Sequence, residues 1–199
     1  MTLPNWNVED YLFEFEPIQY TGRLVDAPLI FKTGKVLGFL HDSIFSDAFK
    51  ALKCGAELSA LLMGFSIIEY LAGYYTGRRT KSDGFISFIN AYFPEVYSKF
   101  IDDIYEQLRC GLVHNLSLQN PWKPSENKFK IETNSKSHLK KENSLVVFSI
   151  YHFLEDSRRA MVMYLYDLVM KKSENQDLIK NFEKRFNRQE GVTSIMIKS

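Results

Sequence analysis

Apolar residues recur every three or four positions over most of the chain, which is the period of an amphipathic helix. This period predicts helices at about residues 35–53, 56–75, 85–93, 95–114, 151–172 and 178–186. The polar run His41–Ser43 interrupts the first of them, so that segment forms either one broken helix or two short ones. Helices of this length and number predict a mainly α protein.

Two short runs of β character, residues 129–133 and 145–150, lie between the fourth and fifth predicted helices. A polar, lysine-rich connection joins them, which predicts a small β-hairpin insertion with a long loop.

The acidic segment at about residues 1–34 is divided by proline and glycine and is expected to be irregular. Residues 190–199 are expected to form a loose tail. No repeat or linker divides the chain, so residues 1–199 are predicted to be a single domain.

Composition excludes several classes of protein. The 199 residues are 45% apolar and carry a formal net charge of +1, so the chain is not a general polycation and nucleic acid would need a local basic patch. Cys54 and Cys110 lie far apart without a CxxC spacing, which favours reduced cytosolic thiols over a disulfide framework or a thiolate zinc site. The acidic N-terminus does not resemble a signal peptide. We therefore expect a cytoplasmic protein without metal or cofactor.

The segment 58–75 is long and apolar enough to consider as a membrane span. Glu69 lies inside it, and a carboxylate in the bilayer core costs about 2.5–3.5 kcal/mol. Basic residues flank both ends, so the charges give no orientation across a membrane. We expect a buried core helix and no membrane partner.

Glu69 falls within the apolar stripe of this helix, about 40° around the helix axis from Phe65. An isolated buried carboxylate costs several kcal/mol, so it must be paired, hydrogen-bonded or protonated. Two interpretations stay open. Glu69 reaches solvent at the edge of the helix, or it pairs with an arginine from a neighbouring helix, for which Arg109 is the best candidate.

Arg109 and His114 lie near the end of the helix predicted at 95–114. In an unbroken α-helix they would be about 140° apart, on opposite sides of the apolar stripe. Gly111 offers a local break, and Asn115 would fall on the stripe itself, so we expect the helix to fray near His114. Regular geometry therefore permits an Arg–His site without requiring one.

The spacing Arg109-x4-His114 on an amphipathic helix resembles the HEPN superfamily (higher eukaryotes and prokaryotes nucleotide-binding), whose members carry an Arg followed four to six residues later by a His. The string LRCGLVHN and the earlier SIIEYLAGYYTG look like prokaryotic proteins of this type. The resemblance covers about residues 56–116. It implies a HEPN-like helical bundle with Arg109 and His114 as catalytic residues.

Catalytic HEPN proteins are metal-independent ribonucleases, often toxins or antiviral effectors, so the resemblance implies an endoribonuclease with a toxin or phage-defence role. His114 would act as general base or acid, and Arg109 would stabilise charge on the phosphorane. We expect Glu69 and Asn115 to support them, with Glu69 orienting Arg109. Because one imidazole cannot easily be acid and base at once, such sites are assembled from two protomers, which implies a homodimer.

One position departs from the family pattern. Active members usually carry a polar residue directly after the Arg, whereas this chain has Cys110. The alternative is therefore a catalytically inactive HEPN-like dimeric module that binds RNA, a nucleotide or a partner protein such as a cognate antitoxin.

Two basic segments are candidate RNA surfaces. Arg78, Arg79 and Lys81 lie beside two tyrosines and would contact phosphates, although a solvated loop between helices explains them as well. The predicted hairpin region carries six lysines against three glutamates and is either a second RNA surface or a sheet edge protected by lysine. The remaining histidines show no metal-ligand spacing and are expected at the surface or packed; they are His41, His138 and His152.

Overall fold

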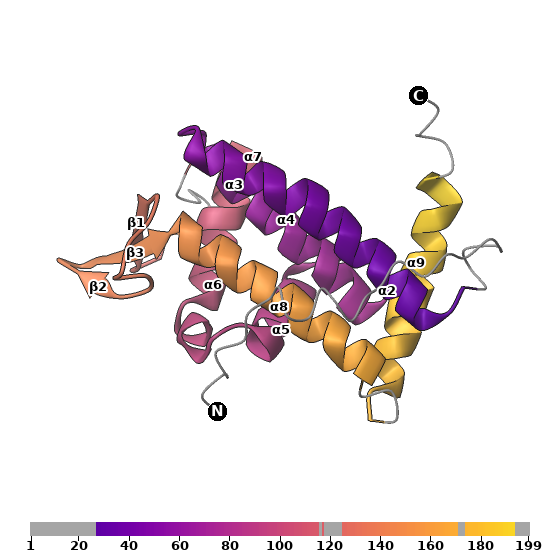
Figure 1. The fold of residues 1–199 in the computed structure, drawn as a ribbon. Coiled ribbons are helices and arrows are strands. Elements are labelled where there is room, and N and C mark those ends of the chain that lie inside the picture. Colours follow the sequence, from indigo (N-terminus) through magenta and orange to yellow (C-terminus); the bar gives the residue numbers. More distant parts are fainter. Residues whose placement is uncertain (1–26, 116, 118–124, 171–173, 194–199) are drawn as a thin grey trace.

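The structure is a computed structural model that describes residues 27–115, 117, 125–170 and 174–193. Helices make up most of it, and a small three-stranded sheet lies at one end of the helical bundle, where α8 begins (Figure 1). The mainly α fold with a small β insertion is therefore confirmed. The N-terminal residues 1–26 lie outside the described part of the chain.

A continuous helical run opens the described chain. It consists of α2 (Leu29–Gly38), a π-helical segment η2 (Phe39–Phe45) and α3 (Ser46–Lys53). The prediction of irregular chain up to about residue 34 is wrong for residues 29–34, which are helical. The polar run His41–Ser43 does not break the helix either, because the wider π turn of η2 accommodates it without ending the helical hydrogen bonding.

The central helix is α4 (Glu57–Thr76), which lies between α2–α3 and α8 (Figure 1). Among the described residues it is the single helix that is long and apolar enough to cross a membrane, judged by length and composition, and more than half of it is buried inside the bundle. Its core face packs the Phe65 ring against the ring of Phe153, with centroids 5.0 Å apart. Gly77 ends α4 in the left-handed region at φ 65°, and α5 (Ser82–Tyr92) follows a short loop.

The single helix predicted at 95–114 is wrong in detail, because the structure divides this segment into four pieces. A 3-10 turn η3 (Glu95–Lys99) is followed by one turn of helix, α6 (Ile101–Asp103). A π-helical segment η4 (Ile104–Cys110) then continues into α7 (Gly111–Asn115). The break falls at Phe100, whose φ of −129° is not helical, and Gly111 keeps α-helical dihedral angles.

The sheet has the order β1 (Lys128–Glu132), β3 (Leu145–Ser149), β2 (Lys141–Glu142). The predicted hairpin between residues 129–133 and 145–150 is wrong in its pairing, because β1 and β3 run parallel, with Phe129 opposite Val146. The tight hairpin joins β2 and β3 instead, and Asn143 and Ser144 turn it with φ of 47° and 68°. Two residues with positive φ match the right-handed twist of antiparallel strands, which favours this local pairing.

Two helices complete the bundle, α8 (Ile150–Met170) and α9 (Gln176–Thr193). The helix α8 follows β3 without a loop and packs on α4, while α9 crosses the far end of the bundle from the sheet (Figure 1). The predicted loose tail at 190–199 is wrong for residues 190–193, which belong to α9, and residues 194–199 lie outside the described part. This arrangement places α4 in contact with every long helix that follows it.

Candidate functional site

Glu69 and Arg109 form an ion pair between α4 and η4, through Oε1 of Glu69 and Nη2 of Arg109. Their side chains are 30% and 17% exposed, so the pair lies at the border between core and solvent. Of the two interpretations of Glu69, the structure shows the pairing with Arg109. The core position of this carboxylate is therefore compensated by an arginine from a segment 40 residues further along the chain.

Arg109 also approaches His114. Its Nη1 lies 3.4 Å from Nε2 of His114, although the two residues would be about 140° apart on a regular α-helix. Arg109 lies near the end of the π-helical segment η4, whereas Gly111 to His114 belong to α7, so the change of helix type does not by itself turn the two side chains to one face. The long guanidinium side chain spans the remaining distance to His114 in α7.

The guanidinium of Arg109 makes two further contacts. It lies over the ring of Tyr105, with Cζ 5.5 Å from the ring centroid, and Nη1 is 3.7 Å from the sulfur of Cys110. Partial burial alone would lower the pKa of Arg109, but the Glu69 carboxylate and the Cys110 sulfur raise it above its usual value. Burial also raises the pKa of the Tyr105 hydroxyl, against the opposing effect of Arg109. Arg109 therefore stays charged under all ordinary conditions.

The contact with Arg109 assigns a hydrogen-bonding role to one ring nitrogen of His114. A guanidinium carries only donors, so Nε2 of His114 is the acceptor in this contact. His114 is exposed at the end of the helical run. Asn115, the other predicted supporting residue, is the last residue of α7, and its side chain is outside the described part.

The predicted RNA-binding residues Arg78, Arg79 and Lys81 are all exposed in the loop between α4 and α5. Arg78 pairs with Asp83, with 2.5 Å between Nη2 and Oδ2, so its charge is partly neutralised. Of the lysines of the second predicted surface, Lys128 and Lys130 lie on β1 and Lys141 lies on β2, the outer strands, as expected of a protected sheet edge. Lys136 and Lys140 lie in the connection between these strands, and Lys123 is outside the described residues.

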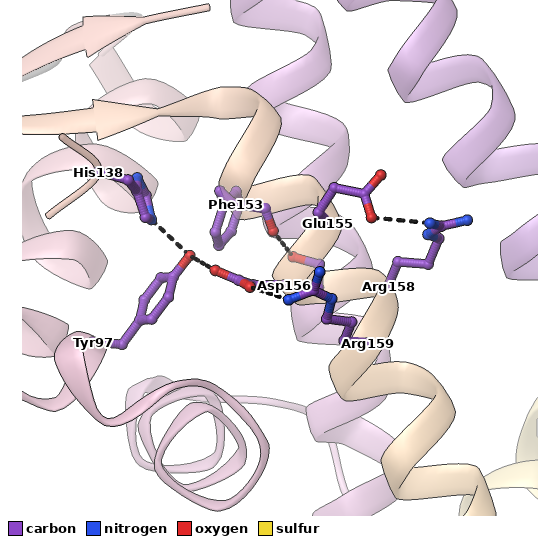
Figure 2. Close-up of polar contacts among 8 residues, drawn as sticks. Tyr97, His138, Phe153, Glu155, Asp156, Arg158 and Arg159 are labelled. Atoms are coloured by element: carbon purple, nitrogen blue, oxygen red, sulfur yellow. Dashed lines mark hydrogen bonds and ion pairs between the residues drawn. The ribbon is translucent and has the colours of Figure 1, made fainter. Parts of the chain in front are cut away.

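A second polar cluster, which the sequence patterns do not reveal, lies where the sheet meets α8 (Figure 2). The backbone N–H of Ser149 donates to Nδ1 of His138 at 2.9 Å, so the ring proton is on Nε2. Nε2 then donates to the Tyr97 hydroxyl at 2.8 Å, and that hydroxyl donates to Oδ2 of Asp156 at 2.9 Å. These residues come from three separate segments, which is why no spacing along the chain signals the cluster.

The titration of this cluster follows from its burial. Burial and the neighbouring His152 ring lower the pKa of His138 from 6.5 to about 3. Burial raises the pKa of Asp156, which the hydrogen bond from Tyr97 and the nearby Arg159 partly oppose. Burial also raises the pKa of the Tyr97 hydroxyl well above its usual value, and Asp156 adds to the effect. Because Tyr97 is fully buried, we assign this relay of hydrogen bonds a structural role that joins η3, the sheet and α8.

Within the part of the chain that the structure describes, no group of three or more His, Cys, Asp or Glu side chains is arranged to hold a metal ion. Both cysteines are free thiols, Cys54 exposed and Cys110 half-buried beside Arg109. No family model matches the chain, and neither a curated protein nor a solved structure matches it significantly. The function is therefore argued from the site itself.

Proposed function

We propose that this protein is a HEPN-like, metal-independent endoribonuclease that uses Arg109 and His114. The observation that supports the proposal is the contact of 3.4 Å between Nη1 of Arg109 and Nε2 of His114, made while Nη2 of Arg109 pairs with Glu69. Arginine and histidine together supply the two functions that cleavage of RNA requires, a stabiliser of phosphoryl charge and a group that transfers a proton.

The proposed reaction uses the ribose 2′-hydroxyl of the substrate as the nucleophile. In the proposed reaction the phosphate draws Nη1 of Arg109 away from His114, and the freed Nε2 of His114 accepts the 2′-hydroxyl proton. The 2′-oxygen then forms a bond to phosphorus, and the bond from phosphorus to the 5′-oxygen breaks. Arg109 stabilises the negative charge on the phosphorane oxygens. The products are a 2′,3′-cyclic phosphate and a 5′-hydroxyl, and neither step requires a metal or a cofactor.

The leaving 5′-oxygen needs a proton from a second group. A second copy of the chain would supply it through its own His114, which gives the proposed protein a homodimeric site. Val113, directly before His114, is an apolar side chain with 48% exposure and would lie in this shared site. Size measurement in solution by light scattering tests the dimer, and a monomer that cleaves RNA would contradict a shared site.

Cleavage in the presence of EDTA tests the reaction. Purified wild-type protein should cleave single-stranded RNA and leave 2′,3′-cyclic phosphate ends, identified by mass spectrometry of the products. His114→Ala and Arg109→Ala should each lower the rate by about 100-fold or more, because each removes a group that acts in the transition state. His41→Ala is the matched control, since His41 contacts only the exposed Asp42 among the described residues. Equal cleavage by the wild type and both site variants would refute the proposal.

A second candidate function is a catalytically inactive HEPN-like module that binds RNA or a partner protein. The observation that favours it is the engagement of the Arg109 guanidinium by Glu69, Tyr105 and the Cys110 sulfur, which leaves its side chain only 17% exposed. Binding of RNA that weakens as salt rises, without any cleavage, would support this function over the first.

Under the nuclease proposal, the cellular role is that of a cytoplasmic toxin or phage-defence component, with RNA as substrate and a cognate antitoxin as protein partner. Induced expression of the wild type should arrest growth of a bacterial host, and His114→Ala should relieve the arrest. Arrest that persists in His114→Ala would contradict a toxic effect through RNA cleavage.

A further inference from the structure

Arg185 of α9 lies beside the turn of α4 that follows Glu69. A Cβ atom at Gly73 would lie 3.4 Å from Nε of Arg185 and 3.1 Å from Oγ1 of Thr80. Gly73 is four residues after Glu69, so both positions are on the same face of α4. The missing side chain at Gly73 therefore gives Arg185 room beside the turn that carries the Glu69–Arg109 pair.

Asn181 holds α9 at this place. Its Nδ2 donates to the backbone oxygen of Tyr75 at 3.0 Å, at the C-terminal end of α4. A Cβ at Gly77 would lie 2.9 Å from Cα of Asn181, so the two backbones are in close contact. Arg185 is four residues after Asn181 and shares its face of α9. This face is thus fixed against the end of α4 and the loop that carries Arg79.

No ion pair of Arg185 is found among the described residues, and its Nε is buried without a hydrogen-bond partner, as is Nε of Arg109. A guanidinium cannot lose its proton in a protein, so the charge needs an anion or water to compensate it. On the same helix the exposed Lys180 does have a carboxylate partner, Asp177, at 3.5 Å.

We propose that Arg185 binds a phosphate of single-stranded RNA next to the Arg109/His114 site. Arg109 and Arg185 approach successive turns of α4, about 5.4 Å apart along the helix axis. Thr80 lies with them, since its Oγ1 donates to the backbone oxygen of Glu69 at 2.6 Å. The backbone oxygen of Arg78 lies 3.4 Å from the same Cβ position at Gly73, so Arg185 lies between the turn that carries Glu69 and the basic loop between α4 and α5. The inference rests on the proposed function, because it takes RNA as the ligand.

The test measures binding separately from cleavage. The probe is a labelled single-stranded RNA with 2′-O-methyl groups, which cannot be cleaved through the 2′-oxygen, and its Kd is measured by fluorescence anisotropy over a range of salt concentrations. Arg185→Gln should raise Kd about tenfold at low salt. It should also lower the slope of log Kd against log salt by about 0.7, the value for one lost phosphate contact on a single strand.

Two variants and a control separate charge from structure. Arg185→Lys keeps the charge, so the salt slope should stay that of the wild type. Gly73→Ala keeps Arg185 but fills the space beside its Nε, so it should weaken binding to a smaller extent. Lys180→Gln removes a cation from the exposed, already paired position on the same helix and should leave both Kd and the slope unchanged. A circular dichroism melt of each variant identifies any that does not fold.

The outcomes distinguish the inference from the proposed function. If the wild type binds the probe and folded Arg185→Gln binds with the same Kd and slope, the inference is refuted, while cleavage that depends on His114 would still stand. If binding depends on Arg185 but unmodified RNA is never cleaved, the inference stands and the nuclease proposal fails. If the wild type does not bind the probe at any salt concentration, the inference is refuted.

Discussion

His138 makes the stability of this protein sensitive to acid, and the variant His138→Gln isolates its contribution. Burial and the neighbouring His152 lower the pKa of the ring, and a proton added at Nδ1 would also face the N–H of Ser149, which points at that atom. Glutamine offers one acceptor and one donor at similar positions but cannot take up a proton near neutral pH. The rest of the buried relay, Tyr97 and Asp156, is unchanged in the variant.

The magnitude follows from the two pKa values of His138. The unfolded chain titrates at 6.5 and the folded chain at about 3. As the pH falls below 6.5, the unfolded state takes up a proton that the folded state does not bind. The contribution of His138 to the free energy of unfolding is therefore fully present above pH 6.5 and is lost as the pH falls toward 3. Each pH unit in this window is worth about 1.36 kcal/mol. Between pH 7 and pH 4.5 this group alone lowers the free energy of unfolding by about 2.5 kcal/mol.

The assay is urea denaturation of the wild type and of His138→Gln at pH 7 and at pH 4.5, followed by circular dichroism. Other groups titrate in both proteins, so the comparison uses the difference between their losses of stability. The wild type should lose about 2.5 kcal/mol more than the variant over this range. Equal losses would show that His138 takes up a proton in the folded state, and the deduced hydrogen-bond directions would then be wrong.

Two further predictions concern glycines whose surroundings differ. Gly64→Ala places a Cβ 2.8 Å from Cε1 of the buried Phe153 ring and should lower the free energy of unfolding by about 1–3 kcal/mol, measured by chemical denaturation. Gly34→Ala is its matched control, since nothing lies within 4 Å of a Cβ there and the helix interior should gain about 0.5–1 kcal/mol. Gly77→Ala combines a positive φ with a Cβ 2.9 Å from the backbone of α9, so we expect a loss of about 2–4 kcal/mol and faster hydrogen exchange in α9. A wild-type exchange pattern in that helix would contradict the contact, and equal stability of the Gly64 and Gly34 variants would contradict the packing argument.

The pattern of apolar residues was sufficient for the long helices. The predicted helices at 56–75 and 151–172 agree with α4 and α8 to within two residues at each end, because helical period and burial are local properties of one segment. The pairing of Glu69 with Arg109 was also foreseen as one of two alternatives, since a carboxylate in an apolar stripe requires a partner.

The details of the helical path were not predictable from period alone. The π-helical segment η4, which carries Arg109, was expected as regular α-helix, and the contact of Arg109 with His114 depends on the conformation of the long arginine side chain. A short segment with i→i+5 hydrogen bonding needs no special residue types. Its apolar pattern therefore looks like that of an ordinary amphipathic α-helix. The parallel pairing of β1 with β3 was missed for a related reason, since strand direction depends on the path of the whole connection.

The sequence by itself determined the helical class, the main helix positions and the candidate pair Arg109 and His114, because each rests on residues close together in the chain. The tertiary structure decided which polar groups meet. His138 contacts Tyr97, and Arg185 lies against Gly73, across separations of 41 and 112 residues. Such contacts depend on the relative placement of packed elements, which no local pattern records. The physical reason is that the face of a helix that becomes buried is set by the residues of that helix. Hydrogen bonds between elements form only after core packing has positioned those elements.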